Sequence, residues 1–191
     1  MEFATFLLAA RRGYHQSSDE IIRNSIEQVV LSEQAGFQTA SFAEHHFNNY
    51  SLVPSPLMMV AHCAALTSII RLGTAVCVLP LYQPLRLLSE IGLADIVSNG
   101  RLELGVGSGY QQFEFERFGL NVEEAPAVFS ECLDILVKGL NQRSSSTTDG
   151  SKRYLRQRYP SARSRRQCCQ SGSLRRPETA WGGPIVRDTI C

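Results

Sequence analysis

The chain has 191 residues, enough for one domain or one domain with a tail, and 43% of them are hydrophobic, as in ordinary globular proteins. Its net charge of +1 joins two segments of opposite sign: residues 1–140 hold eight basic and fifteen acidic side chains, and residues 141–191 hold eleven and three. No run reaches the roughly 20 apolar residues that span a bilayer, and no secretory signal is visible, so we expect no membrane partner.

The first two predicted strands flank a helix with a recognisable start. Residues 2–8 form a short apolar run, typical of a buried strand. Ser17 and Glu20 have the S-x-x-E spacing of a capping box, and apolar residues follow at helical spacing until Gly36, which favours a helix end. Residues 37–43 are the second predicted strand.

The next elements repeat this alternation. Pro54 and Pro56 open a second helix, and residues 72–79 are so uniformly apolar that we expect a strand covered on both faces. Pro84 begins a third helix, which ends at the turn residues Asn99 and Gly100. A fourth strand over residues 102–106 and a last helix over 123–140 complete the series.

Strands that alternate with helices predict a parallel sheet with right-handed crossovers. Each βα unit takes about 35 residues, so eight units would take about 280, close to the ~250 typical of a closed (β/α)8 barrel. The sequence therefore predicts an α/β fold in which residues 1–140 form a partial (β/α)8 TIM barrel of about four units.

Residues 141–191 form a basic tail rich in serine and arginine, with almost no apolar periodicity. Such a segment cannot bury enough apolar surface to offset the entropy of ordering it, so we expect it to be irregular or disordered. Its arginines would also suit a nucleic-acid partner, but few aromatic residues are present to stack on bases, and a solvated tail is favoured.

The triplet of Glu44, His45 and His46 is the leading candidate for chemistry, because barrels keep catalytic groups at the carboxyl ends of their strands. Side chains alternate along a strand, so Glu44 and His46 should point one way and His45 the other. Histidine suits proton transfer near neutral pH, although a rim histidine bonded to a neighbouring loop is the alternative. Neither H-E-x-x-H nor a C-x-x-C pair is present, so we expect no metal site and reduced cysteines in the cytoplasm.

Glycines follow the fourth predicted strand in a G-x-G-x-G pattern at Gly105, Gly107 and Gly109. Tyr110 stands where a dinucleotide fingerprint would need its third glycine, so that fingerprint is not met. Small residues also occupy positions 73–77 of the third strand. Both patterns fit either a flat ligand close to the backbone or tight packing between neighbouring elements.

Taken together, these segments resemble the bacterial-luciferase-like family of flavin-dependent monooxygenases over about residues 1–140. The resemblance implies an oxidoreductase that receives reduced FMN from a separate flavin reductase and uses O2 to oxidise a small organic substrate. Some relatives use the deazaflavin F420 for hydride transfer instead. The matching stretches are residues 1–8, 33–37, 43–47, 71–80, 84–86 and 98–110.

The resemblance also assigns roles to individual positions. His45 matches the family's active-site histidine, and Glu44, which precedes it, is expected among the residues that bind the cofactor. The Ala75–Val76 step falls where the family often has a non-prolyl cis peptide under the flavin ring. Gly107 and Ser108 would also face the cofactor, and they stand where luciferase has a reactive cysteine and where many members have an arginine. These departures favour a monooxygenase other than a light-emitting luciferase.

The second half of the family pattern is absent from residues 141–191, and we expect this segment to come from a shifted reading frame. The flavin phosphate site belongs to later βα loops, so we expect the chain to be truncated and to bind flavin weakly. Unpaired edges on the first and fourth strands would favour a homo-oligomer or aggregation. Alternatives are an F420- or flavin-dependent reductase and a non-catalytic fragment whose basic tail binds nucleic acid.

Overall fold

The computed structural model describes residues 2–13 and 15–141, which form a parallel four-stranded sheet in the order β1-β2-β3-β4. Each strand pairs in parallel with the next one along the chain, as the alternation of elements predicts. Three expectations fall on the basic tail of residues 141–191: disorder, a shifted reading frame and nucleic-acid binding. All of the tail except residue 141 lies outside the described residues. The strands are β1 (Ala4–Leu7), β2 (Thr39–Phe42), β3 (Arg71–Val78) and β4 (Leu102–Gly107).

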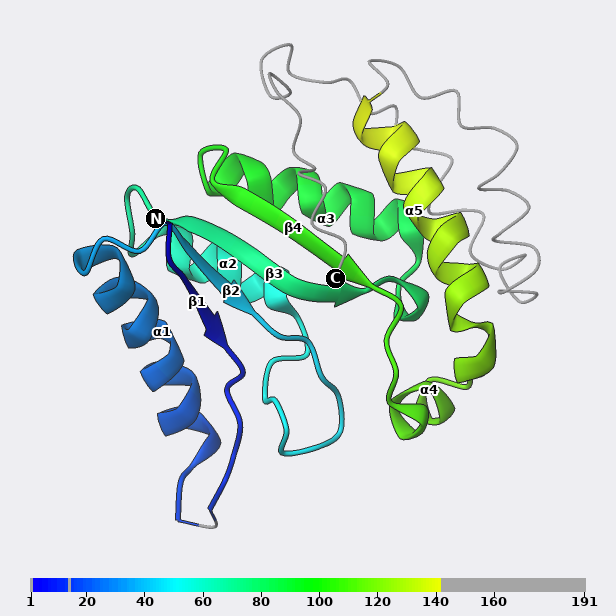
Figure 1. Ribbon diagram of the computed structural model, residues 1–191, viewed down its shortest axis with the longest axis horizontal. Coiled ribbons are helices and arrows are strands. Elements are labelled where there is room, and N and C mark those ends of the chain that lie inside the picture. The colour runs from blue at the N-terminus through cyan, green and yellow to red at the C-terminus, as the bar shows by residue number, and fades with distance from the viewer. Residues whose placement is uncertain (1, 14, 142–191) are drawn as a thin grey trace, which may run out of the picture.

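A helix follows each strand, and Figure 1 shows α2 and α3 lying behind the sheet. A short helix that the sequence pattern did not predict, α4, precedes the last helix; its six residues are too few to show a helical period. The helices are α1 (Ser18–Gln34), α2 (Pro56–Ala64), α3 (Pro84–Val97), α4 (Gln112–Arg117) and α5 (Ala125–Asn141), with single 3-10 turns η1 (Leu79–Leu81) and η2 (Val122–Glu124).

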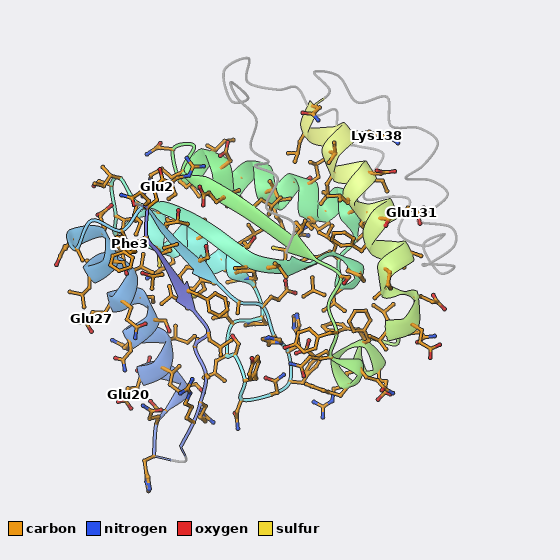
Figure 2. All side chains as sticks on the ribbon, in the orientation of Figure 1. Glu2, Phe3, Glu20, Glu27, Glu131 and Lys138 are labelled. Atoms are coloured by element: carbon orange, nitrogen blue, oxygen red, sulfur yellow. The ribbon has the colours of Figure 1, made fainter. Side chains whose placement is uncertain are left out.

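The predicted helix start at Ser17 is confirmed. The Ser17 hydroxyl oxygen accepts a hydrogen bond from the Glu20 N–H at 3.1 Å, which satisfies one of the free amide donors at the beginning of α1. The predicted proline starts at Pro56 and Pro84 are confirmed as the first residues of α2 and α3. Charged side chains such as Glu27 project from the outer side of α1 (Figure 2).

The hydrophobic core lies between the helices and one face of the sheet. On β2, Ala40 and Phe42 are buried in this core, whereas Thr39 and Ser41 alternate with them and are only half-buried. The other face of the sheet is partly open: Phe6 of β1 is 58% exposed although the next residue of the strand is buried. Among the residues that the structure describes, helices thus cover one face of the sheet and not the other.

The amino ends of the strands are joined by two charged side chains. The carboxylate of Glu33, near the end of α1, accepts hydrogen bonds from the N–H groups of residues 68, 69 and 70 at 2.8, 2.7 and 2.9 Å. Arg101, just before β4, donates to the carbonyl oxygens of Ala64 (2.9 Å) and Ile70 (3.1 Å) and to the Thr67 hydroxyl (2.9 Å). These bonds fix the α2–β3 loop against α1 and β4.

Candidate active site

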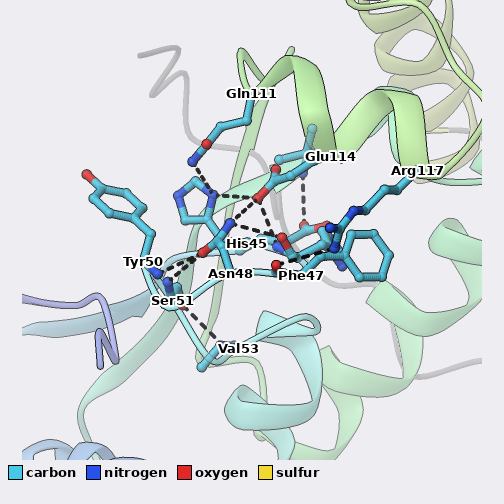
Figure 3. Close-up of polar contacts among 12 residues, drawn as sticks. His45, Phe47, Asn48, Tyr50, Ser51, Val53, Gln111, Glu114 and Arg117 are labelled. Atoms are coloured by element: carbon cyan, nitrogen blue, oxygen red, sulfur yellow. Dashed lines mark hydrogen bonds and ion pairs between the residues drawn. The ribbon is translucent and has the colours of Figure 1, made fainter. Parts of the chain in front are cut away.

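The Glu-His-His triplet lies directly after β2, at the carboxyl edge of the sheet, where the sequence predicts it. Two segments meet there. The loop that follows β2 carries His45, and the short helix α4, which follows β4, carries Glu114. Figure 3 shows side chains from both loops converging on the His45 ring. The His45 N–H donates to the carbonyl oxygen of Val53 at 3.2 Å, which folds the β2–α2 loop back on itself.

Glu114 is the centre of this arrangement, and its side chain is only 3% exposed. Its Oε1 atom accepts the His46 N–H at 2.9 Å and the Asn48 side-chain amide at 3.0 Å, and it lies 3.1 Å from His45 Nδ1. A carboxylate can only accept hydrogen bonds, so the His45 ring donates from Nδ1 in this contact. Glu114 therefore fixes the orientation of the ring and directs Nε2 away from itself.

Glu44 points in another direction, and this confirms the predicted alternation. Its Oε1 accepts from His46 Nε2 at 2.9 Å, and its Oε2 accepts from the Val78 N–H at 3.0 Å. Burial, together with this carboxylate, raises the pKa of Cys77 and of Tyr82 above their ordinary values. The buried Glu44 side chain thus ties the end of β2 to the end of β3.

The Ala75–Val76 peptide is cis, as the family resemblance implies. It lies within β3, where the pairing with β4 shifts register between Thr74 and Cys77. A Cβ atom on Gly105 would lie 2.2 Å from the Thr74 carbonyl oxygen, and one on Gly107 would lie 2.6 Å from a methyl carbon of Val76. Close packing of β4 on β3 is therefore one reason for the glycines, and it leaves a surface with few side chains at this end of the sheet.

The remaining predicted residue, Ser108, follows β4 directly, and its hydroxyl lies 3.4 Å from the Gly109 carbonyl oxygen. The structure thus brings the predicted positions to the carboxyl ends of three adjacent strands: His45 after β2, Ala75–Val76 in β3, and Gly107 and Ser108 at the end of β4.

Aromatic side chains surround the histidines. The ring centroid of His45 lies 4.8 Å from that of Tyr50 and 6.2 Å from that of Tyr110, both edge-on. His46 packs edge-on against Phe118 at 5.0 Å. Beside them, eight residues between positions 45 and 54 line a hollow of about 550 Å³, which falls in the size range of small-molecule sites.

Sequence reasoning missed Glu114, Gln111 and Asn48. Gln111 places its side-chain amide 3.2 Å from His45 Nδ1, and Asn48 completes the bonding of Glu114. These residues lie in loops or in a very short helix, and their partners are 66 to 69 positions away in the chain. The spacing of residues in the sequence does not predict contacts over such distances along the chain.

The described residues contain neither a metal-binding cluster nor a membrane-spanning helix. Within residues 2–13 and 15–141, no group of three or more histidine, cysteine, aspartate and glutamate side chains is arranged to hold a metal ion. In that same part of the chain, no helix is long and apolar enough to cross a membrane.

Comparison with known proteins identifies the family. The sequence model of the luciferase-like monooxygenase family matches residues 1–173. An uncharacterised protein of Sinorhizobium fredii, y4vJ, is 82% identical over 143 residues, which are 75% of this chain and 41% of that protein. The oxygenase component of the flavin-dependent trigonelline monooxygenase of Acinetobacter baylyi is 33% identical over 117 residues, which are 61% of this chain and 32% of that protein.

A solved structure shows the same fold. The oxygenating constituent of 3,6-diketocamphane monooxygenase from Pseudomonas putida, in complex with FMN, superposes with a TM-score of 0.70 at 22% identity, over 76% of this chain and 41% of that one. The four βα units are thus part of a (β/α)8 barrel, and the chain spans less than half the length of these relatives. The chain belongs to the luciferase-like monooxygenase family.

Proposed function

We propose that the chain carries the acid/base part of a flavin-dependent oxygenase site, which uses reduced FMN and O2 on a small organic substrate. The observation that carries the proposal is the His45–Glu114 pair at the carboxyl edge of β2, with Nδ1 held by the buried carboxylate. Histidine held in this way exchanges a proton at Nε2, as a general acid or base requires. The flavin dependence named for the trigonelline relative supports FMN over the F420 alternative.

The residues at the strand ends fit a flat cofactor. Gly105 and Gly107 have no side chains, and Ala75 and Val76 are half-buried, so the ends of β3 and β4 offer a backbone surface beside His45. Reduced FMN, when bound, supplies the reaction with O2 and the oxygen transfer. The chain's own residues would support the ring from Ala75, Val76 and Gly107 and offer the Ser108 hydroxyl as a hydrogen-bond partner.

Glu44 contributes to this site indirectly in the proposal. Its carboxylate holds the Val78 N–H and the His46 ring, so it fixes the end of the strand that contains the cis peptide. His45 is the catalytic residue, Glu114 and Glu44 are positioning residues, and Ala75, Val76, Gly107 and Ser108 form the cofactor surface.

Weak flavin binding is part of the proposal, because barrels commonly hold a phosphate in later βα loops and the described part of this chain has four units. The four described βα units would then support little activity by themselves. A separate flavin reductase is the proposed source of reduced FMN, since the trigonelline relative is named as an oxygenase component. Cys63 and Cys77 of this chain are free thiols, which favours the cytoplasm as the compartment of the chain.

A titration of the full chain with two flavins tests the proposal. Lumiflavin has the ring of FMN but no phosphate, so we expect both flavins to bind with similar, weak affinity through the ring. The His45→Gln variant should retain this binding, because His45 is proposed to move a proton and not to support the ring. Fluorescence quenching of each flavin measures the affinities. FMN binding at least tenfold tighter than lumiflavin binding would contradict the proposal that the flavin is held weakly and through its ring alone.

Supplying the later βα units of a relative as a second chain tests the catalytic roles. Co-expression with the remaining carboxyl-terminal part of the Sinorhizobium fredii relative y4vJ should raise FMN affinity, since the two are 82% identical over the shared segment. In that complex, His45→Gln and Glu114→Gln should slow substrate oxidation with little change in FMN affinity. Equal turnover by the wild-type and His45→Gln complexes would overturn the role of His45.

A further inference from the structure

Two exposed tyrosines flank His45, and the proposed chemistry leaves them without a role. Tyr50 comes from the loop after β2, and Tyr110 comes from the loop after β4. Their rings stand at 76° and 82° to the imidazole, with centroid distances of 4.8 and 6.2 Å. Tyr50 is 51% exposed and Tyr110 is 69% exposed, although the His45 side chain between them is only 11% exposed.

Both rings lie against the histidine, Tyr50 from the loop after β2 and Tyr110 from the loop after β4. Partial burial raises the pKa of Tyr110, and the nearby Tyr50 hydroxyl contributes to the same shift, which agrees with two neighbouring phenols. Large aromatic faces that stay open to solvent beside a buried polar pair are typical of ligand sites and not of core packing. Figure 3 shows the Tyr50 ring standing beside the His45 ring.

We propose, resting on the oxygenase function above, that Tyr50 and Tyr110 form an aromatic slot that receives a planar aromatic ring of the substrate beside His45. Each tyrosine ring stands nearly perpendicular to the imidazole, and both tyrosines are more than half exposed, so each keeps open ring surface for a second ring. Offset stacking of two aromatic rings is favourable beyond the area it buries, and a saturated ring of the same size gains only the area term. The slot therefore selects an aromatic substrate over an aliphatic one.

A pair of matched probes tests this inference on the full chain without flavin. Benzamide and cyclohexanecarboxamide share the amide group and differ in the aromatic ring. Histidine labelled with carbon-13 reports binding by nuclear magnetic resonance, and the His45→Gln spectrum identifies the His45 resonance. We expect benzamide to shift that resonance in a saturable way, and cyclohexanecarboxamide to shift it weakly or not at all. His62, on α2, serves as the internal reference that should not move.

Substitutions at the two tyrosines complete the test. Tyr50→Leu and Tyr110→Leu keep an apolar side chain but remove the ring, so each should weaken benzamide binding by about threefold to tenfold. Tyr50→Phe and Tyr110→Phe should bind benzamide like the wild-type chain. Circular dichroism verifies that each variant is folded, as exposed positions allow.

Equal shifts from the two probes, or no loss of binding in the leucine variants, would overturn the slot. Because no flavin is present in this experiment, such a failure would leave the flavin titrations and the role of His45 untouched. Conversely, selective benzamide binding would stand even if the chain bound no flavin.

Discussion

The carboxylate of Glu33 shows how a single residue couples the fold to pH. Burial opposes its ionisation, but three backbone N–H donors and the nearby Arg101 outweigh burial and lower its pKa below the ordinary 4.5. A carboxyl group whose pKa is lower in the folded state stabilises the fold above the unfolded pKa. That contribution is lost as the pH falls from about 4.5 through the folded value.

Glu33→Gln should therefore lower the free energy of unfolding by about 1 kcal/mol at pH 7, because charge-assisted hydrogen bonds to three amides become neutral ones. The deficit relative to wild type should shrink below pH 4.5 as the wild-type carboxyl is protonated. Urea denaturation at several pH values measures both effects. Glu27→Gln, on the outer side of the same helix (Figure 2), is the control and should change stability little. Equal losses in the two variants would contradict the role of Glu33.

Two buried thiols give a second prediction at the residue scale. Burial raises the pKa of Cys63 to about 11 and also raises that of Cys77, so at pH 8 about one Cys63 in a thousand is a thiolate. Iodoacetamide at pH 8 should leave both cysteines unmodified in the folded chain and should modify both in urea. Peptide mass spectrometry separates them from the other cysteines. Rapid native labelling of Cys77 would show that the β3 core is open.

For single residues, the sequence predicted the place of His45 at the carboxyl edge of the sheet. It also predicted that Glu44 and His46 point to one side and His45 to the other, because the alternation of a strand is a local property. It could not predict Glu114, since that carboxylate reaches His45 only after β3 and β4 have folded beside β2. Neither could it distinguish packing from ligand binding at Gly105, which depends on the approach of the Thr74 carbonyl oxygen.

The pairing of β3 with β4 is the element most sensitive to an added atom. Thr74 and Gly105 exchange two hydrogen bonds: the Thr74 hydroxyl donates to the Gly105 carbonyl oxygen at 2.7 Å and accepts the Gly105 N–H at 3.0 Å. The same closeness leaves no space for a Cβ atom on Gly105, and the atom in its way belongs to the backbone. A substitution there must move a strand and not merely a side chain.

Gly105→Ala should accordingly reduce the free energy of unfolding by about 3 kcal/mol, the upper end for an overpacked core. Gly13→Ala is the matched control, because no atom lies within 4 Å of its Cβ position. Thermal and urea unfolding of both variants measure the difference. Unchanged stability of Gly105→Ala would mean that β3 and β4 separate at little cost.

At the scale of elements, periodicity predicted all four strands and the four long helices, because both follow from repeated burial on one side. Strand ends were less accurate: β1 has four residues where the apolar run has seven. The helix α4 could not be predicted, since six residues span less than two turns, yet it carries Glu114.

The whole molecule has an uneven surface, because helices cover one face of the sheet and β1 and β4 are the outer strands of the described residues. Phe3 and Phe6, on β1 or just before it, are 56% and 58% exposed. Unpaired strand edges with exposed apolar side chains promote association between chains. We therefore predict that the chain associates with a second copy of itself through the open face.

Phe6→Lys should shift the full chain toward the monomer, since it places a charge on that face. Leu93→Lys is the control: Leu93 is 61% exposed on α3, so this variant affects association only if helix faces pair instead. Light scattering after size-exclusion chromatography, over a range of concentrations, gives the masses. A wild-type chain that is monomeric throughout, or an effect of Leu93→Lys alone, would contradict association through the open face.

The hydrogen bonds of Glu33 and Arg101 lie at one end of the sheet, and His45 and His46 lie at the other end. The bonds that bind α1, the α2–β3 loop and β4 lie at the amino ends of the strands, and the loops after β2 and β4 make none of them. Libraries randomised in those two loops, with Glu44, His45, Asn48 and Glu114 retained, should yield mostly folded variants. The scaffold is thereby a starting point for directed evolution toward new substrates, with stability and chemistry adjustable at separate ends.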